Sequence, residues 1–137
     1  MLKAMAAYAG FEEKDYDSIF ILLDKMDKIG IDGVKECLIN DGYDKAGSEK
    51  YLDLFAKLEG NDNLIGFLAD TLGDFLPAEC KTNLEEITFA VNSAKAADFN
   101  LVFDPTLVRG MSYYTGTIFE VELKEFNSSC GGGGRYD

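Results

Sequence analysis

The sequence predicts an α+β protein, in which a helical subdomain of residues 1–97 is followed by a short antiparallel β segment of residues 98–137. Over the first hundred residues, apolar side chains recur at intervals of three and four, and most of these series end at a glycine. After Asp98 the interval changes to two, and β-branched and aromatic residues become frequent. The composition, 47% hydrophobic and 28% charged with two prolines, is typical of a folded chain with its own core.

Six amphipathic helices are predicted in the helical subdomain. In each of them the apolar side chains define one face, which is the normal signature of core packing. Glycine readily adopts the left-handed conformation that ends a helix, and glycines 10, 30, 42 and 60 follow the first four series. The expected caps are Asp32, Asn61 or Asn63, with Pro77 in the first turn of the last helix. The six apolar series span residues 2–9, 19–26, 34–39, 51–58, 64–72 and 84–94.

Two strands are predicted in the β segment. Residues 100–103 are apolar and precede the turn pair Asp104 and Pro105, and residues 117–124 alternate between apolar and polar side chains. The face of the second strand that is predicted to be buried consists of Thr117, Phe119, Val121 and Leu123. A turn is predicted at residues 127–129. Because two strands bury little surface, we expect this sheet to pair with strands outside the chain.

The charge of the chain argues against a nucleic-acid partner of its own. The net charge is −12, and since residues 101–137 hold three basic and five acidic groups, residues 1–100 carry −10. Such a surface repels phosphate chains at long range and gains nothing from counterion release.

Several kinds of site and location are excluded by residue usage. The chain has no histidine, which excludes Ser/His/Asp or Cys/His catalysis and histidine-ligated metals within it. Cys37, Cys80 and Cys130 form no CxxC pair, so we expect three reduced thiols and no metal site. No apolar run approaches the roughly 20 residues that cross a bilayer. With no targeting pattern at the first residues, a cytoplasmic location without a membrane is predicted.

The two most distinctive segments are residues 109–116 and 131–137. An arginine beside a glycine, as at Arg109, can present a planar and permanently charged group to a phosphate or carboxylate. Tyr113 and Tyr114 point to opposite faces of an extended segment, so at most one lines a given pocket. The glycine run 131–134 lets a backbone approach a ligand closely. Taken singly, these features have commoner explanations: a surface turn, strand packing and a flexible loop.

In combination, the two segments resemble the histidine-specific motifs of histidyl-tRNA synthetases. Residues 107–120 read Leu-Val-Arg-Gly-Met-Ser-Tyr-Tyr-Thr-Gly-Thr-Ile-Phe-Glu and resemble the first motif, usually Arg-Gly-Leu/Met-x-Tyr-Tyr-Thr/Asn-Gly. Residues 133–137, Gly-Gly-Arg-Tyr-Asp, resemble the second motif, and the two follow in the family's order. Residues 23–28 and 33–35 resemble, more loosely, the helical segment after the second class II motif.

The resemblance implies an internal fragment of the catalytic region of a class II aminoacyl-tRNA synthetase. Residues 1–97 would form its helical insertion, and residues 98–137 a part of its catalytic antiparallel sheet. The parent enzyme would activate L-histidine with ATP and Mg²⁺, transfer it to tRNA(His), and act as a cytoplasmic homodimer. By itself the fragment is expected to be inactive, to hold no cofactor and, because it is acidic, to bind no tRNA.

The resemblance also assigns roles to residues at matching positions. Arg109 matches the arginine beside the α-phosphate, where charge develops during activation, and Tyr113 and Tyr114 match residues of the histidine pocket. Ser112 stands where many members have aspartate, so this chain has no carboxylate at that position. The floor and side of the same pocket are matched by Gly133, Gly134 and Tyr136.

Two other functions remain compatible with the sequence. The first is a non-catalytic, synthetase-like regulatory protein that binds histidine. The presence of Arg109 counts against it, since a protein that only binds histidine has no α-phosphate charge to stabilise. The second is an acidic helical interaction module whose glycine-rich tail is a flexible linker.

Overall fold

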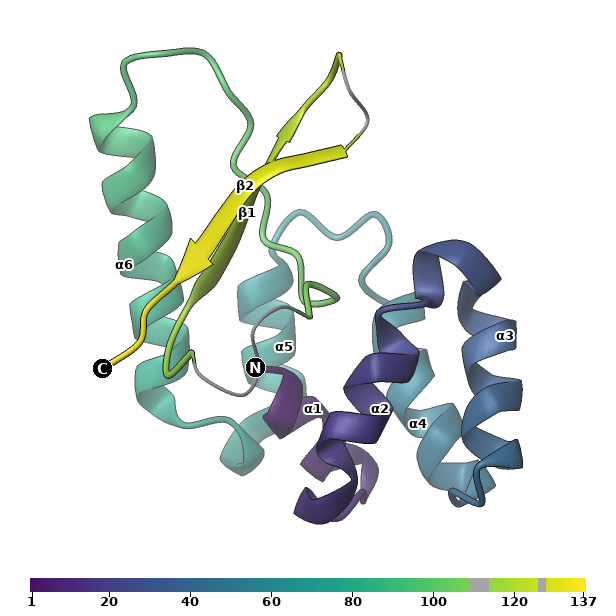
Figure 1. Ribbon diagram of the computed structural model, residues 1–137. Coiled ribbons are helices and arrows are strands. Elements are labelled where there is room, and N and C mark those ends of the chain that lie inside the picture. The colour runs from purple at the N-terminus through teal and green to yellow at the C-terminus, as the bar shows by residue number, and fades with distance from the viewer. Residues whose placement is uncertain (109–113, 126–127) are drawn as a thin grey trace. The chain divides into compact units, whose positions relative to one another are not determined.

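The computed structural model of the protein describes residues 1–108, 114–125 and 128–137 (Figure 1). Within these residues, six α-helices precede one two-stranded antiparallel sheet, which confirms the predicted α+β class. The chain divides into two compact units, Met1–Thr106 and Leu107–Asp137, and each is described by itself below. The elements are α1 (Leu2–Ala9), η1 (Glu13–Asp15), α2 (Tyr16–Leu23), α3 (Met26–Asn40), α4 (Lys45–Ala56), α5 (Leu64–Leu72), η2 (Gly73–Phe75), α6 (Ala78–Ala94), β1 (Ile118–Leu123) and β2 (Ser128–Gly134).

The predicted helix ends agree with the structure where a local residue determines them. Gly10 ends α1 with a φ of 96°, in the left-handed region. The side chain of Asn63 caps α5, because its Oδ1 accepts a hydrogen bond from the Gly66 N–H at 3.1 Å. Asp44 caps α4 in the same way, with its Oδ2 2.8 Å from the Gly47 nitrogen.

The helix boundary predicted at Gly30 is confirmed, because the backbone of this residue separates two helical stretches of α3. Gly30 lies inside α3 with φ 71° and ψ 173°, which makes a kink between two helical stretches. Glycine adopts such a φ at little cost, and the helical conformation is interrupted at this residue. Met26, predicted at the end of the preceding helix, instead begins α3, and Asp32 lies just after the kink within α3. The cap predicted at Asp32 stays a prediction.

The core of the helical unit is centred on Tyr51 of α4, which is completely buried. Its ring meets the rings of Phe11 and Phe55 edge-on, with centroids 5.5 and 5.2 Å away. Lys50, the preceding residue, joins α4 to α1, since its Nζ donates a hydrogen bond to the Tyr8 carbonyl at 2.7 Å. The other large, fully buried side chains are Met5, Ile19, Phe20, Leu23, Val34, Leu38, Leu68 and Leu72.

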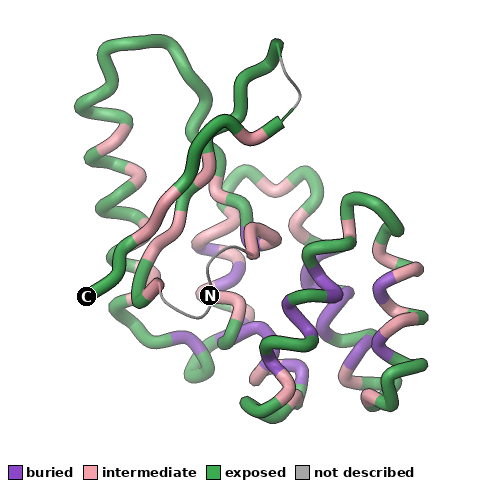
Figure 2. The backbone as a smooth tube through the Cα atoms, viewed as in Figure 1, coloured by how far each residue is buried: buried purple, intermediate pink, exposed green. Residues whose placement is uncertain are grey.

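Helix α6 contributes no buried residue to this core (Figure 2). Its apolar face was predicted to be core and consists of Leu84, Ile87, Val91 and Ala94. Ile87 is 41% exposed, Leu84 and Val91 are half-buried, and Ala94 is exposed. The reason is the packing of the unit, in which α6 has its principal contact with α5. The helical pattern therefore predicts α6 correctly, but not the burial of its apolar face.

Residues 100–103 do not form the predicted strand. A strand requires a neighbour for its backbone hydrogen bonds, and within the described part of the first unit no other segment is a strand. The turn predicted at Asp104 is present, because Asp104 Oδ1 accepts hydrogen bonds from the Thr106 N–H and Oγ1 at 2.8 and 2.6 Å. This segment groups with the helices in the compact unit that ends at Thr106. The domain division at residue 97 stays a prediction.

The second unit is a β-hairpin in which the glycine run is a strand. β1 pairs with β2 so that Ile118 lies opposite Gly134. The register shifts between Val121 and Glu122, which leaves Cys130 as an extra residue, as in a β-bulge. Residues 128 and 129 belong to β2 and not to the predicted turn. Because β1 supplies a full ladder of backbone partners, the glycines form a strand despite their low β propensity.

The apolar face of β1 is more exposed than predicted. Phe119, Val121 and Leu123 are 57%, 45% and 42% exposed, whereas Ile118 and Glu120 on the other face are half-buried. The residues opposite Phe119 and Val121 are glycines, so no cross-strand side chain covers this face. The alternation predicts the strand correctly but assigns the more buried side to the wrong face.

Replacing Tyr51 with phenylalanine should raise the free energy of unfolding by about 1 kcal/mol. The Tyr51 hydroxyl is buried and has no hydrogen-bond partner within the described residues, so its desolvation is uncompensated. The same burial raises the pKa of this hydroxyl. Urea unfolding followed by circular dichroism measures the change.

The matched control is Tyr43→Phe, since the Tyr43 ring also meets Phe11 edge-on but is only half-buried. It should change the free energy of unfolding by less than about 0.5 kcal/mol. A clear destabilisation in Tyr51→Phe alone would contradict the prediction.

Candidate functional site

The ring of Tyr114 lies directly against the backbone of Gly134. A β-carbon built on Gly134 would be 2.9 Å from Cγ and Cδ1 of Tyr114 and 2.8 Å from Cγ2 of Ile118, closer than real β-carbons approach other atoms. The tyrosine therefore occupies the space that a side chain at position 134 would fill. The two segments singled out in the sequence meet at this contact.

Gly133 faces the opposite side of the hairpin. Neighbouring residues of a strand alternate between its faces, and a β-carbon on Gly133 would lie 3.1 Å from Cζ of Phe119. Gly131 differs from both, because a β-carbon there would meet no atom within 4 Å. The glycines of this run therefore differ in how closely other side chains approach them. Tyr114 contacts Gly134 and Phe119 contacts Gly133, whereas Gly131 faces open space.

Backbone hydrogen bonds extend the hairpin beyond the ends of its two strands. The Thr115 N–H donates to the Arg135 carbonyl at 2.8 Å, and the Arg135 N–H donates to the Thr117 carbonyl at 3.1 Å. These bonds fix the segment that follows Tyr114 against the segment that follows Gly134. The relative position of Tyr114 and Gly134 therefore depends on this pairing.

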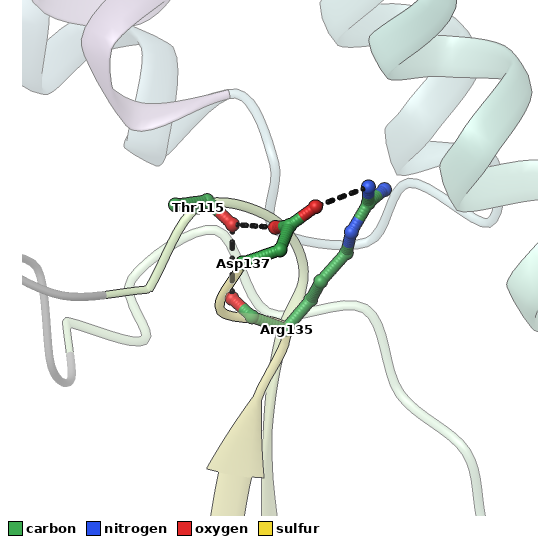
Figure 3. A network of polar contacts seen from close by, with 3 residues as sticks. All are labelled: Thr115, Arg135 and Asp137. Atoms are coloured by element: carbon green, nitrogen blue, oxygen red, sulfur yellow. Dashed lines mark hydrogen bonds and ion pairs between the residues drawn. The ribbon is translucent and has the colours of Figure 1, made fainter.

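A polar network lies next to the Tyr114 contact (Figure 3). Thr115 Oγ1 donates a hydrogen bond to Oδ1 of Asp137, and Arg135 Nη2 donates to Oδ2 of the same carboxylate at 2.8 Å. The hydrogen bond from Thr115 and then the Arg135 guanidinium lower the pKa of the Asp137 carboxyl. Because the folded-state pKa is lowered, the network stabilises the folded state above the ordinary pKa of aspartate. That contribution is lost as the pH falls through the lowered value.

The structure brings together only some of the residues predicted for the site. Tyr114 and Gly134 are in contact, whereas Gly133 lies on the other face of the strand. Tyr136 is 75% exposed and is not part of the close contacts described above. Residues 109–113 of the first motif, which include Arg109, Ser112 and Tyr113, lie outside the described residues.

Sequence reasoning missed the residues that hold these two segments together: Thr115, Gly116, Ile118, Arg135 and Asp137. Their contacts depend on which residues face each other across the hairpin. The sequence pattern does not specify that register, since a strand of glycines has no alternating side chains to define its faces. The sequence feature that could have pointed to these five residues is that they lie within the two motif segments, 107–120 and 131–137.

Other kinds of site receive no support from the described residues. Residues 1–108, 114–125 and 128–137 include no group of three or more His, Cys, Asp or Glu side chains that could hold a metal ion. Cys37, Cys80 and Cys130 are free thiols. Within the same residues, no helix combines the length and the apolar character that crossing a membrane requires.

Comparison with known proteins identifies the family. The model of the histidyl-tRNA synthetase family matches residues 1–137, which is the whole chain. The chain therefore belongs to the histidyl-tRNA synthetase family, as the two motifs predicted.

Curated relatives carry the name histidine–tRNA ligase. The protein from Leifsonia xyli subsp. xyli is 38% identical over 143 residues, an alignment that covers all of this chain and 32% of the relative. The protein from Flavobacterium johnsoniae is 38% identical over 149 residues and is covered over 29% of its length. The protein from Korarchaeum cryptofilum is 38% identical over 120 residues, with 87% of this chain and 27% of the relative covered. The chain thus spans about a third of the length of these relatives or less.

Substitution of Gly134 by alanine should weaken the hairpin by about 1 to 3 kcal/mol, because the new methyl group must displace Tyr114 and Ile118. Amide hydrogen exchange of Arg135 measures this, since its N–H is bonded across the hairpin to Thr117. Exchange should become faster in the variant.

Gly131→Ala provides the matched control within the same glycine run. Its methyl group enters open space. The free energy of opening derived from the exchange rate of the Arg135 amide should therefore change by less than about 0.5 kcal/mol. Equal exchange rates in both variants would show that the contact with Tyr114 is not needed.

Proposed function

We propose that this chain is the helical insertion and the histidine-recognition hairpin of a histidine–tRNA ligase. The observation that carries the proposal is the contact between Tyr114 and Gly134, which joins the two histidine-specific motifs in one small site. The names of the relatives support the same activity. The ligase joins L-histidine to ATP, giving histidyl-adenylate and pyrophosphate, and then transfers the histidyl group to tRNA(His).

In this proposal Tyr114 recognises the substrate side chain. A phenol can donate or accept a hydrogen bond, so it can satisfy an imidazole nitrogen in either role. The side chain is half-buried and lies over a backbone that carries no side chain, which leaves its position defined by the hairpin. A pocket that hydrogen-bonds its substrate rejects analogues that lack the partner atom far better than an apolar pocket does. Gly134 would form the floor of the proposed pocket beneath Tyr114, and the resemblance adds Tyr113 and Tyr136. Gly133 lies on the other face of the strand and is not assigned to this pocket.

Arg109 is the proposed catalytic residue. As the histidine carboxylate attacks ATP, negative charge increases at the α-phosphate, and a guanidinium placed there stabilises the transition state more than the ground state. Arginine suits this role because it stays charged at every pH of interest and can bind two oxygens at once.

ATP is the proposed co-substrate, with Mg²⁺ in the complete ligase. The described residues do not fit a metal site, because they include no suitable group of metal ligands.

The wider assignments follow from the same proposal. The hairpin would belong to the antiparallel sheet of a class II catalytic domain, and its exposed apolar face of Phe119, Val121 and Leu123 agrees with further covering there. The ligase would be a cytoplasmic homodimer. The net charge of −10 on residues 1–100 makes independent tRNA binding by this chain unfavourable, so tRNA contacts would come from the rest of the ligase.

The 137 residues alone should give no histidine-dependent exchange between ATP and pyrophosphate. The proposed pocket contributes one charged group at the α-phosphate, whereas activation needs the complete set of groups that hold ATP. The exchange of labelled pyrophosphate into ATP measures this directly, with a thermal melt to show that the chain is folded. Exchange that requires L-histidine and disappears in Arg109→Ala would contradict the expected inactivity.

In the ligase that carries this sequence, Arg109→Ala should lower histidine-dependent exchange about 100-fold or more, as expected for losing one transition-state contact. Histidine affinity, measured by calorimetry, should change by less than about threefold, because the arginine acts on charge that the bound amino acid does not yet have. Lys124→Ala removes an exposed basic residue from the same unit and serves as the control. If Arg109→Ala weakens histidine binding as much as exchange, a histidine-binding regulatory protein becomes the better description.

A further inference from the structure

Thr115, Arg135 and Asp137 form a closed ring of contacts at one end of the hairpin (Figure 3). The Asp137 carboxylate accepts a hydrogen bond from Thr115 through one oxygen and, through the other, a bond from Arg135 Nη2 at 2.8 Å. The ring is closed through the backbone, because the Arg135 carbonyl accepts a hydrogen bond from the Thr115 N–H at 2.8 Å. We call these three residues the clamp.

Gly116 allows the clamp to close. A β-carbon on Gly116 would lie 3.0 Å from Cδ and 3.1 Å from Cβ of Arg135, so the aliphatic part of the arginine passes directly over the glycine backbone. From there the guanidinium reaches Asp137. The arginine is thus guided by packing along its length as well as by its charge.

Each member of the clamp is close in the chain to a member of the Tyr114 contact. Thr115 follows Tyr114, and Arg135 follows Gly134. A clamp between Thr115 and the segment after Gly134 therefore limits how far the Tyr114 ring can slide over the glycine backbone.

We propose that Thr115, Arg135 and Asp137 are positioning residues that hold Tyr114 in register over Gly134, and thereby set the geometry of the histidine pocket. This inference rests on the proposed function for the identity of the substrate. The charged side chains of Arg135 and Asp137 are 69% and 58% exposed, and exposed ion pairs contribute little to stability. Their main effect is therefore on position, and substitutions in the clamp should leave the melting temperature nearly unchanged.

The geometry can be tested by NMR on the 137-residue chain, independently of any activity. In the wild type, the Tyr114 ring protons should show a nuclear Overhauser effect to the Gly134 α-protons, which the ring should also shift upfield. Thr115→Val and Asp137→Asn should each weaken this contact and reduce the shift. Thr115→Ser, which keeps the hydroxyl, should preserve both, and so should Glu122→Gln, which removes an exposed carboxylate elsewhere in the hairpin. Unchanged spectra in Thr115→Val and Asp137→Asn would overturn the clamp.

The consequence for recognition can be tested in the ligase that carries this sequence. Thr115→Val and Asp137→Asn should raise the KM for histidine about 10-fold, because a shift of the order of 1 Å in a substrate-positioning group has effects of this size or larger. In both variants the KM for ATP should stay within about twofold of the wild-type value. The Thr115→Ser variant, which keeps the hydroxyl, should have a KM for histidine close to that of the wild type. Equal increases in both KM values would overturn a role specific to the histidine pocket.

The two measurements separate the failure of this inference from the failure of the proposed function. If the wild-type ligase shows no histidine-dependent exchange, the proposed function fails, while the NMR comparison still decides whether the clamp positions Tyr114. If exchange is normal but the substitutions change neither the spectra nor the KM for histidine, only the clamp is wrong.

Discussion

The geometry of the hairpin depends on side chains that approach the glycine run 131–134 of β2, which has no side chains of its own. Four consecutive glycines weaken the intrinsic preference of β2 for a strand, yet they leave room on both of its faces. Tyr114 uses this room at Gly134, and Phe119 uses it at Gly133. The strand is maintained by its ladder with β1, whose backbone bonds replace what glycine lacks in propensity. The glycines allow Tyr114 and Phe119 to approach the backbone of β2 closely, and the pairing with β1 keeps the glycines in a strand.

The fold could be predicted from the sequence to the extent that local chemistry determines it. Helices whose apolar faces and caps lie within a few residues were found, as with Gly10 and the Asn63 cap. The predictions that were wrong concern features that depend on contacts with residues distant in the chain. Residues 100–103 have the composition of a strand but no neighbouring strand within the described unit. Helix α6 has the periodicity of a core helix but buries none of its residues.

The candidate site was predictable as two motifs but not as an arrangement. The motif segments identify Tyr114 and Gly134, because tyrosine and glycine at those positions carry the resemblance to the family. What the pattern could not provide was the register of a strand without side chains, and with it the pairing of Thr115 with Arg135. The separation of Gly133 from Gly134 by strand alternation also follows only once the strand is known. The family could thus be identified from the sequence, whereas the geometry of the hairpin could not.

The glycine run also affects how this sequence can evolve. Every replacement of a glycine by another amino acid adds a β-carbon, but the additions are not equivalent along β2. At Gly131 the carbon enters open space, so drift at that codon is tolerable on steric grounds. At Gly134 it collides with the Tyr114 ring and with Ile118, so a lineage could accept the change only together with adjustments at both of these positions. The effect of a replacement at position 134 should therefore depend on the residues at positions 114 and 118, whereas the effect of a replacement at position 131 should not.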